Sequence, residues 1–200
     1  MNAHRYFMIN KPMNMVSQFV SSHAVNLLTS LPFNFPEGTH AIGRLDQNSE
    51  GLLLLTTNKK ITRLLFQGAV PHKRTYLVQV KHQVQQHTID LLAKGIQISA
   101  VNGTQYTTTP CAVQLVKKPD GLFEVGKPLH ENVISSWLLI TLTEGKFHQV
   151  RKMVAAVHHK CIRLIRVSIE DLELGTMQPG EVVELTEKYF FEKLNLNSKA

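Results

Sequence analysis

The chain has 200 residues, of which 43% are hydrophobic and 18% charged, and its formal net charge is +7. A chain of that length can bury a core in one large domain or in two small lobes. The excess of Lys and Arg favours a polyanionic partner, with nucleic acid ahead of an anionic membrane. A basic surface that binds no ligand would carry the same charge. The two cysteines are far apart in the sequence, which argues against a disulfide framework and a structural zinc site. No leader segment and no long apolar run is seen, so we expect a cytoplasmic protein rather than a membrane protein.

Short elements separated by turn residues are predicted along the first part of the chain. Residues 6–10 are predicted to form a strand, and residues 23–31 a short helix that Pro32 stops. The leucines at 52–55 are typical of a short, fully buried strand. Asn58 is a suitable N-cap for a helix that continues through Phe66, with Gly68 beyond its end.

The rest of the chain is predicted to hold more strands than helices. Strands are predicted over 73–80, 107–116, 137–143, 161–169 and 181–185, and helices over 85–94, 148–157 and 189–194, with a polar excursion at 117–132. Because strands and helices do not alternate strictly, we expect an α+β fold with a mixed, largely antiparallel sheet flanked by helices. No phosphate-binding glycine motif and no HExxH occurs, so neither a nucleotide cofactor nor a metal is expected.

Polar residues concentrate in three stretches at predicted strand ends. Each has an ordinary structural explanation: a solvated turn for "GRLDQNSEG" (43–51), edge-strand charges for "KRTY" (73–76), and a water-facing helix start for "EGKFHQVRK" (144–152). Together they offer the following candidate site residues: Arg44, Asp46, Lys73, Arg74, Tyr76, Lys146, His148, Gln149, Arg151 and Lys152.

These residue types suit chemistry on one nucleotide of a polyanion. A carboxylate among cations stays ionised at neutral pH and can act as a nucleophile or general base. An aromatic ring can stack on or orient a base, while cations hold phosphates.

The same stretches resemble the ordered motifs of the RNA pseudouridine synthases. "GRLDQNSEGLLLLT" is similar to the first signature of the ribosomal group that carries GRLD where a related group carries HRLD. "KRTYLVQV" resembles the second motif, "LTEGKFHQVRKM" the third, and "RLIRVSIEDLELGTMQPGE" the strand, turn and strand that follow. The set runs from "NKPMNMVSQF" to "GEVVEL" in the family's order.

The resemblance implies a role for each candidate. Asp46 would be the essential aspartate, Tyr76 the ring that packs against the target base, and Lys146, or else Arg151, the cation that pairs with the carboxylate. Arg44 would face the RNA strand or hold the target base out of its stack. The RNA-binding set would further include Lys73, Arg74, His148, Gln149 and Lys152.

The resemblance also implies a fold and a substrate. We expect one catalytic domain over residues 1–196, with two lobes around a central cleft, no N-terminal S4 domain and a frayed tail at 197–200. The implied partner is ribosomal RNA and the implied reaction isomerises one uridine of 23S rRNA to pseudouridine, without a cofactor or metal because no atoms are added. A monomer without membrane contact is expected. The residues Phe147 and His148 in the third motif are also compatible with the enzymes of this family that act on 16S rRNA.

Two other kinds of function remain open at this point. A non-catalytic RNA-binding module would explain the charge and the aromatic strand, but would not require Asp46. A glycosidase could use Asp46 and Glu50 as a carboxylate pair if both lay on one helix face. Gly51 and the leucine strand argue against a helix there.

Overall fold

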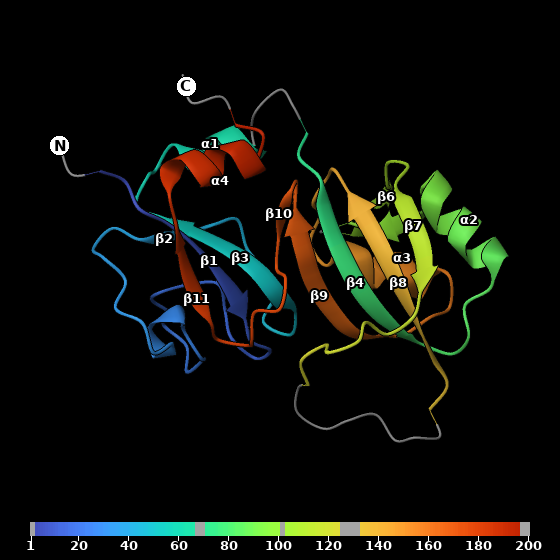
Figure 1. Cartoon of the computed structure of the whole chain (residues 1–200). Helices are drawn as coiled ribbons and strands as arrows, with labels where there is room; N and C mark the ends of the chain where they lie inside the picture. Colours follow the sequence, from blue (N-terminus) through green and yellow to red (C-terminus); the bar gives the residue numbers. More distant parts are fainter. Residues whose placement is uncertain (1–2, 67–70, 101–102, 125–132, 197–200) are drawn as a thin grey trace. The chain divides into compact units, whose positions relative to one another are not determined.

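The computed structural model describes residues 3–66, 71–100, 103–124 and 133–196, and the chain forms two compact units (Figure 1). Unit 1 comprises Met1–His72 and Arg166–Ala200, and unit 2 comprises Lys73–Ile165. The chain passes from unit 2 back into unit 1 within strand β9 (Cys161–Ile169).

The sheet of unit 1 is built around its first strand. β1 (Tyr6–Lys11) pairs antiparallel with β11 (Val182–Leu185) on one side and with β3 (Glu50–Thr56) on the other. β2 (His40–Ile42) also pairs with β3, and β10 (Leu172–Glu173) pairs with the end of β9. The helices of this unit are η1 (Leu28–Ser30), α1 (Ile61–Phe66) and α4 (Glu187–Lys193).

Unit 1 buries both faces of β1. Successive strand residues point to opposite faces, so Tyr6 packs on Phe190 of α4, with 4.6 Å between ring centroids, while Phe7 packs on Phe33 and Phe35 on the other face. Every residue of the neighbouring β3 is buried as well. Burial on both sides explains why the leucine run is continuous rather than alternating with polar residues.

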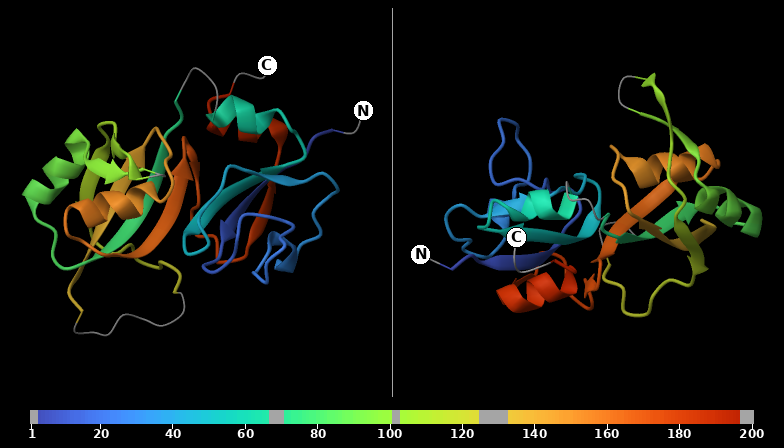
Figure 2. Two further views of the ribbon diagram at one scale, coloured as in Figure 1. Left: turned by 180° about the vertical axis from the view of Figure 1, so that it is seen from behind. Right: turned by 90° about the horizontal axis from the view of Figure 1, so that it is seen from above.

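In unit 2, two helices lie on one face of sheet strands that pair antiparallel (Figure 2). β8 (Ser135–Leu142) lies between β4 (Arg74–Lys81) and β7 (Ala112–Val116), and the first half of β9 lies beside β4. A hairpin joins β5 (Gln97–Ser99) to β6 (Gln105–Thr107), and the helices are α2 (Gln86–Lys94) and α3 (Gln149–Ala156). Their apolar faces meet the strands in one core that includes Val78, Leu92, Ile140, Met153 and Val154.

The α+β class and the largely antiparallel pairing are confirmed, and so are most predicted elements. The predicted stop of α2 at Gly95 has a steric cause: φ is +93°, and a Cβ there would lie 2.3 Å from the carbonyl oxygen of Thr108.

No helix among the described residues is long and apolar enough to cross a membrane. The single domain over residues 1–196 stays a prediction.

Two predicted elements are wrong. Residues 23–31 form only η1, because their backbone bonds to the preceding loop: Val16 N–H donates to the Asn26 carbonyl and Leu28 N–H to the Gln18 carbonyl, each at 2.9 Å. The strand expected over 107–116 is split, since Thr108 N–H donates to Ile96 and Cys111 N–H to Ala93. Gly68, the tail 197–200 and residues 125–132 of the polar excursion lie outside the described residues.

Candidate functional site

Asp46 lies in a tight turn of unit 1 between β2 and β3. The carbonyl of Asp46 accepts a hydrogen bond from Ser49 N–H at 3.0 Å, and β3 begins at the next residue, Glu50. The side chain of Asp46 is half-buried, while that of Arg44 is exposed. Since a turn and a strand, rather than a helix, join Asp46 to Glu50, the two carboxylates do not share a helix face.

Ser17 ties the backbone next to Asp46 to the loop that follows β1. Its hydroxyl donates to the Leu45 carbonyl and accepts from Leu45 N–H, both at 3.0 Å, and both residues are buried. A backbone held on both its donor and its acceptor has little freedom to rotate. The position from which Asp46 projects is therefore fixed by its neighbour in the chain.

Lys11 makes a second link between the same two segments. It is a fully buried lysine, with 0% of its surface exposed. Its Nζ donates to the carbonyls of Pro12 at 2.8 Å and Met15 at 2.7 Å, and reaches the carbonyl of Gln47 at 3.4 Å. An ammonium has three donors, and here all three serve backbone oxygens that surround the turn.

Further charges are buried near Lys11 in unit 1. Glu50 is 0% exposed, and Arg166, which is 2% exposed, donates from Nε to the Leu52 carbonyl at 2.8 Å. Burial lowers the pKa of Lys11 to about 8, the charges of Glu50 and Asp46 oppose this, and the charge of Arg166 adds to it. Buried charges are costly unless they are compensated. The Asp46 turn therefore lies close to three buried charged side chains, those of Lys11, Glu50 and Arg166.

In unit 2, Tyr76 lies on β4 with its ring half-buried and packed against the core of that unit. Lys73, just before β4, is exposed. Arg74 donates from Nη2 to the Thr143 carbonyl at 2.9 Å. A Cβ on Gly145 would lie 3.1 Å from Nη1 of the same guanidinium. Arg74 thus packs beneath the segment 143–145, and the missing side chain of Gly145 leaves room for it.

Glu144 organises the turn that leads into α3. Its carboxylate accepts hydrogen bonds from the Tyr106 hydroxyl, from Thr109 N–H at 3.0 Å and from Gln149 Nε2 at 2.7 Å. Burial raises the pKa of Glu144, but these hydrogen bonds outweigh it and leave that pKa below its ordinary value. Gln149 is itself buried, and its Oε1 accepts from Lys146 N–H at 2.8 Å.

The same turn presents an exposed aromatic ring. Phe147 is 60% exposed and stacks on the ring of His148, with 3.9 Å between centroids. Lys152 Nζ lies 5.3 Å from the Phe147 centroid, and Lys146 Nζ lies 4.6 Å from that of Tyr106. Arg151, on α3, is half-buried. An exposed ring among cations suits stacking on a base beside bound phosphates.

Comparison with known proteins identifies the family. Residues 5–156 match the model of the family described as RNA pseudouridylate synthase. Ribosomal large subunit pseudouridine synthase E of Vibrio parahaemolyticus is 32% identical over 184 residues, which cover 90% of this chain and 74% of that protein. The chain belongs to the RNA pseudouridylate synthase family.

Two further similarities agree with this assignment. Ribosomal small subunit pseudouridine synthase A of Escherichia coli is 28% identical over 185 residues, which cover 92% of this chain and 71% of that protein. A crystal structure of a pseudouridylate synthase matches with a TM-score of 0.76 and 27% identity over 97% of this chain and 75% of the other. The chain is thus an RNA pseudouridine synthase, an isomerase, and neither a binding module without activity nor a glycosidase.

The predicted site residues of the synthase fall into both units. Arg44 and Asp46 lie in the segment between β2 and β3 of unit 1. The other eight lie in unit 2, on or just before β4, in the turn before α3, or on α3 itself. Gln149 is buried and its amide bonds within the unit, and its expected contact with RNA stays a prediction.

Sequence reasoning missed the residues that support the site. Lys11, Ser17 and Arg166 read as ordinary polar positions in the sequence, and their burial follows only from pairing between segments far apart in the chain. Glu144 was noticed only as part of a polar stretch. Phe147 carried a usable signal, because an aromatic residue in an otherwise charged turn has no core to face.

Proposed function

We propose that this synthase isomerises one specific uridine to pseudouridine in 23S ribosomal RNA, acting in the cytoplasm as a monomer, with Asp46 as the group that acts at the sugar. The observation that carries the proposal is the Asp46 turn, which Ser17 and Lys11 hold from both sides within a GRLD segment. The name of the Vibrio relative, a large subunit enzyme, supports the choice of 23S rRNA.

The reaction explains why an ionised carboxylate is needed. The bond between ribose C1′ and uracil N1 breaks, the base turns over, and C1′ joins C5. The proton on C5 is lost and N1 gains one, so the product is an isomer of the substrate. Asp46 acts either by attack on C1′ or by assisting loss of the C2′ proton to give a glycal; both use the carboxylate as an electron-pair donor.

The base must leave its stack before this chemistry begins. Extrusion costs about a few kcal/mol, which contacts to the base and to phosphates offset. In this proposal the ring of Tyr76 packs against the target base, and Arg44 holds the strand or the extruded base. Lys146 comes before Arg151 as the cation that supports the carboxylate.

The remaining residues of the RNA-binding set in unit 2 have the role of holding the RNA backbone. Lys73, His148 and Lys152 are assigned to RNA, together with the exposed ring of Phe147. Arg74 and Gln149 belong to the same RNA-binding set, and each also bonds to the backbone of the turn between β8 and α3.

The decisive experiment maps pseudouridines in rRNA from cells with and without the gene. We expect the loss of one 23S site, restored by the wild-type gene and not by an Asp46→Asn version. Loss of a 16S site instead would favour the second candidate, the same reaction on small-subunit rRNA, which the 28% identity to the Escherichia coli enzyme keeps open. An unchanged map would overturn both.

A further inference from the structure

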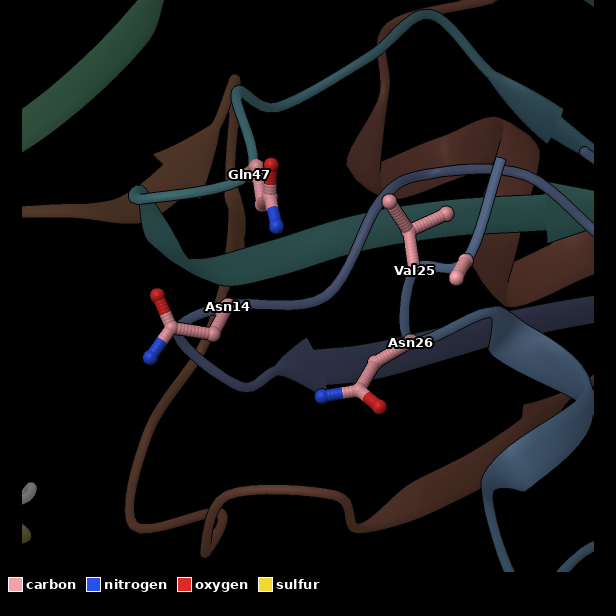
Figure 3. Close-up of a pocket in the computed structure, with 5 residues that line it drawn as sticks. Asn14, Val25, Asn26 and Gln47 are labelled. Atoms are coloured by element: carbon pink, nitrogen blue, oxygen red, sulfur yellow. The ribbon is translucent and has the colours of Figure 1, made fainter.

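An open pocket of about 420 Å³ lies in unit 1 beside the Asp46 turn (Figure 3). Its lining residues are Asn14, Ala24, Val25, Asn26 and Gln47. Three of these five carry a carboxamide and none is charged. All of the lining residues except Val25 are exposed, so the pocket is open to one group of a larger ligand.

The carboxamides come from three separate chain segments, as Figure 3 shows. Asn14 lies in the loop after β1 at a φ of +62°, a left-handed conformation that asparagine tolerates better than most residues. Asn26 lies in a second loop, which is joined to the first by the hydrogen bond from Val16 N–H to its carbonyl. Gln47 belongs to the turn itself.

The pocket is held close to Asp46 by the chain. Gln47 follows Asp46 directly, so their Cα atoms are about 3.8 Å apart. Lys11 bonds to the carbonyls of both Met15 and Gln47 and so links one wall of the pocket to the other. A group bound here would therefore lie next to the turn that carries Asp46.

The lining chemistry selects a class of ligand. Each carboxamide both donates and accepts, which matches the mixed donors and acceptors on a nucleobase edge, and asparagine and glutamine are common partners of base edges. Val25 offers an apolar contact for the face of a base. A phosphate would call for cations in the lining, and a purely apolar ligand would leave the amides unpaired.

We propose that this carboxamide pocket binds the base of a nucleotide that neighbours the target uridine in the substrate RNA. The inference rests on the proposed function and adds to it a determinant of sequence specificity. The pocket residues make no contact with the reacting atoms in this proposal; they select which uridine is placed at Asp46.

The test uses the full-length enzyme and short RNAs that carry the mapped uridine, with each flanking nucleotide replaced in turn by the other three. Wild-type kcat/KM should fall about tenfold or more for replacements at one flanking position, in line with the loss of base-edge hydrogen bonds. The Asn26→Ala, Gln47→Ala double variant should be slower on the natural sequence and should lose this preference. Gln18→Ala, an exposed amide on the same loop that does not line the pocket, should behave as wild type.

A double variant that keeps both the rate and the preference overturns the pocket while leaving the proposed function intact. If the wild-type enzyme modifies no rRNA, the proposed function fails and the pocket is judged by binding alone. Side-chain amide resonances of Asn26 and Gln47, assigned from the single variants, are then followed on addition of the four homopolymeric RNA hexamers. Shifts at these two amides and not at Gln18 support base binding, and their absence overturns it.

Discussion

In the proposed mechanism the chemistry depends on Asp46, and the backbone next to it is held by Ser17. Because Ser17 bonds only to the backbone of Leu45, replacing the carboxylate leaves the turn in place. We expect Asp46→Asn to bind RNA as tightly as wild type and to lose at least about a hundredfold in activity, since the amide is a poor nucleophile and base. Tritium release from 5-tritiated uridine RNA measures the reaction.

The matched control is Asp120→Asn, an exposed aspartate of unit 2, which should retain full activity. If Asp46→Asn forms pseudouridine at nearly the wild-type rate, Asp46 is not the group that acts at the sugar.

Lys11 gives a second prediction at the scale of one residue, in stability rather than activity. Its pKa is about 8 in the folded chain and near 10.5 unfolded. Between these values the unfolded chain binds more protons, so stability rises with pH. Between pH 7 and pH 11 the free energy of unfolding of the wild type should rise by roughly 3 kcal/mol relative to that of Lys11→Met.

Urea unfolding of both proteins at the two pH values measures this difference. Lys59→Met, which removes an exposed lysine of the same unit, should show the same pH dependence as wild type. A gap between wild type and Lys11→Met that stays constant with pH would mean that Lys11 titrates normally.

Among the elements, the turn between β8 and α3 depends on one carboxylate. Glu144→Gln removes the charge that accepts three donors, and we expect it to cost about 1–2 kcal/mol of stability at neutral pH. The pKa of Glu144 is lowered, so its stabilising effect is present above pH 4.5 and is lost as the pH falls below that value.

Thermal unfolding at pH 7 and pH 3.5 checks both statements. The difference between wild type and Glu144→Gln should shrink at the lower pH. Glu124→Gln breaks only an exposed ion pair with Lys118 and should have little effect at either pH. Equal losses in the two variants would show that Glu144 does not organise the turn.

The elements that sequence predicted well are those whose pattern is local. The leucine run of β3 and the nine residues of β9 carry their own strand signal, and Gly95 marks the end of α2 because its φ of +93° favours glycine. β2 and β5 have only three residues each, too few for an alternating pattern to indicate a strand, and they are defined by their pairing with β3 and β6.

The candidate site shows the same difference between residues that a sequence motif indicates and residues that only the folded structure reveals. Asp46 and Tyr76 were found because they belong to ordered motifs, and their roles remain predictions. Lys11 and Arg166 each bond to a backbone carbonyl far away in the chain, that of Gln47 for Lys11 and that of Leu52 for Arg166. Sequence motifs therefore indicate the candidate catalytic residues better than the residues that hold the backbone around them.

For the whole molecule, the net charge of +7 predicts that RNA affinity falls as salt rises. Two exposed residues of unit 2 separate this electrostatic contribution from stacking. Lys73→Met should reduce the slope of log affinity against log salt concentration by about 0.7, the value for one phosphate contact on a single strand. Phe147→Ala should weaken binding by about 1–3 kcal/mol, the usual worth of one base stacked on an aromatic ring, with the slope unchanged.

Fluorescence anisotropy with a labelled substrate RNA at several salt concentrations measures both quantities. Phe147→Tyr should bind as wild type, because it keeps the stacking face next to His148. A change of slope in Phe147→Ala would mean that the ring acts only by orienting nearby cations such as Lys152, 5.3 Å from its centroid. Unchanged affinity of Phe147→Ala would instead mean that Phe147 does not contact the RNA. The ring is 60% exposed, so its removal changes the binding free energy only if a base covers it in the complex.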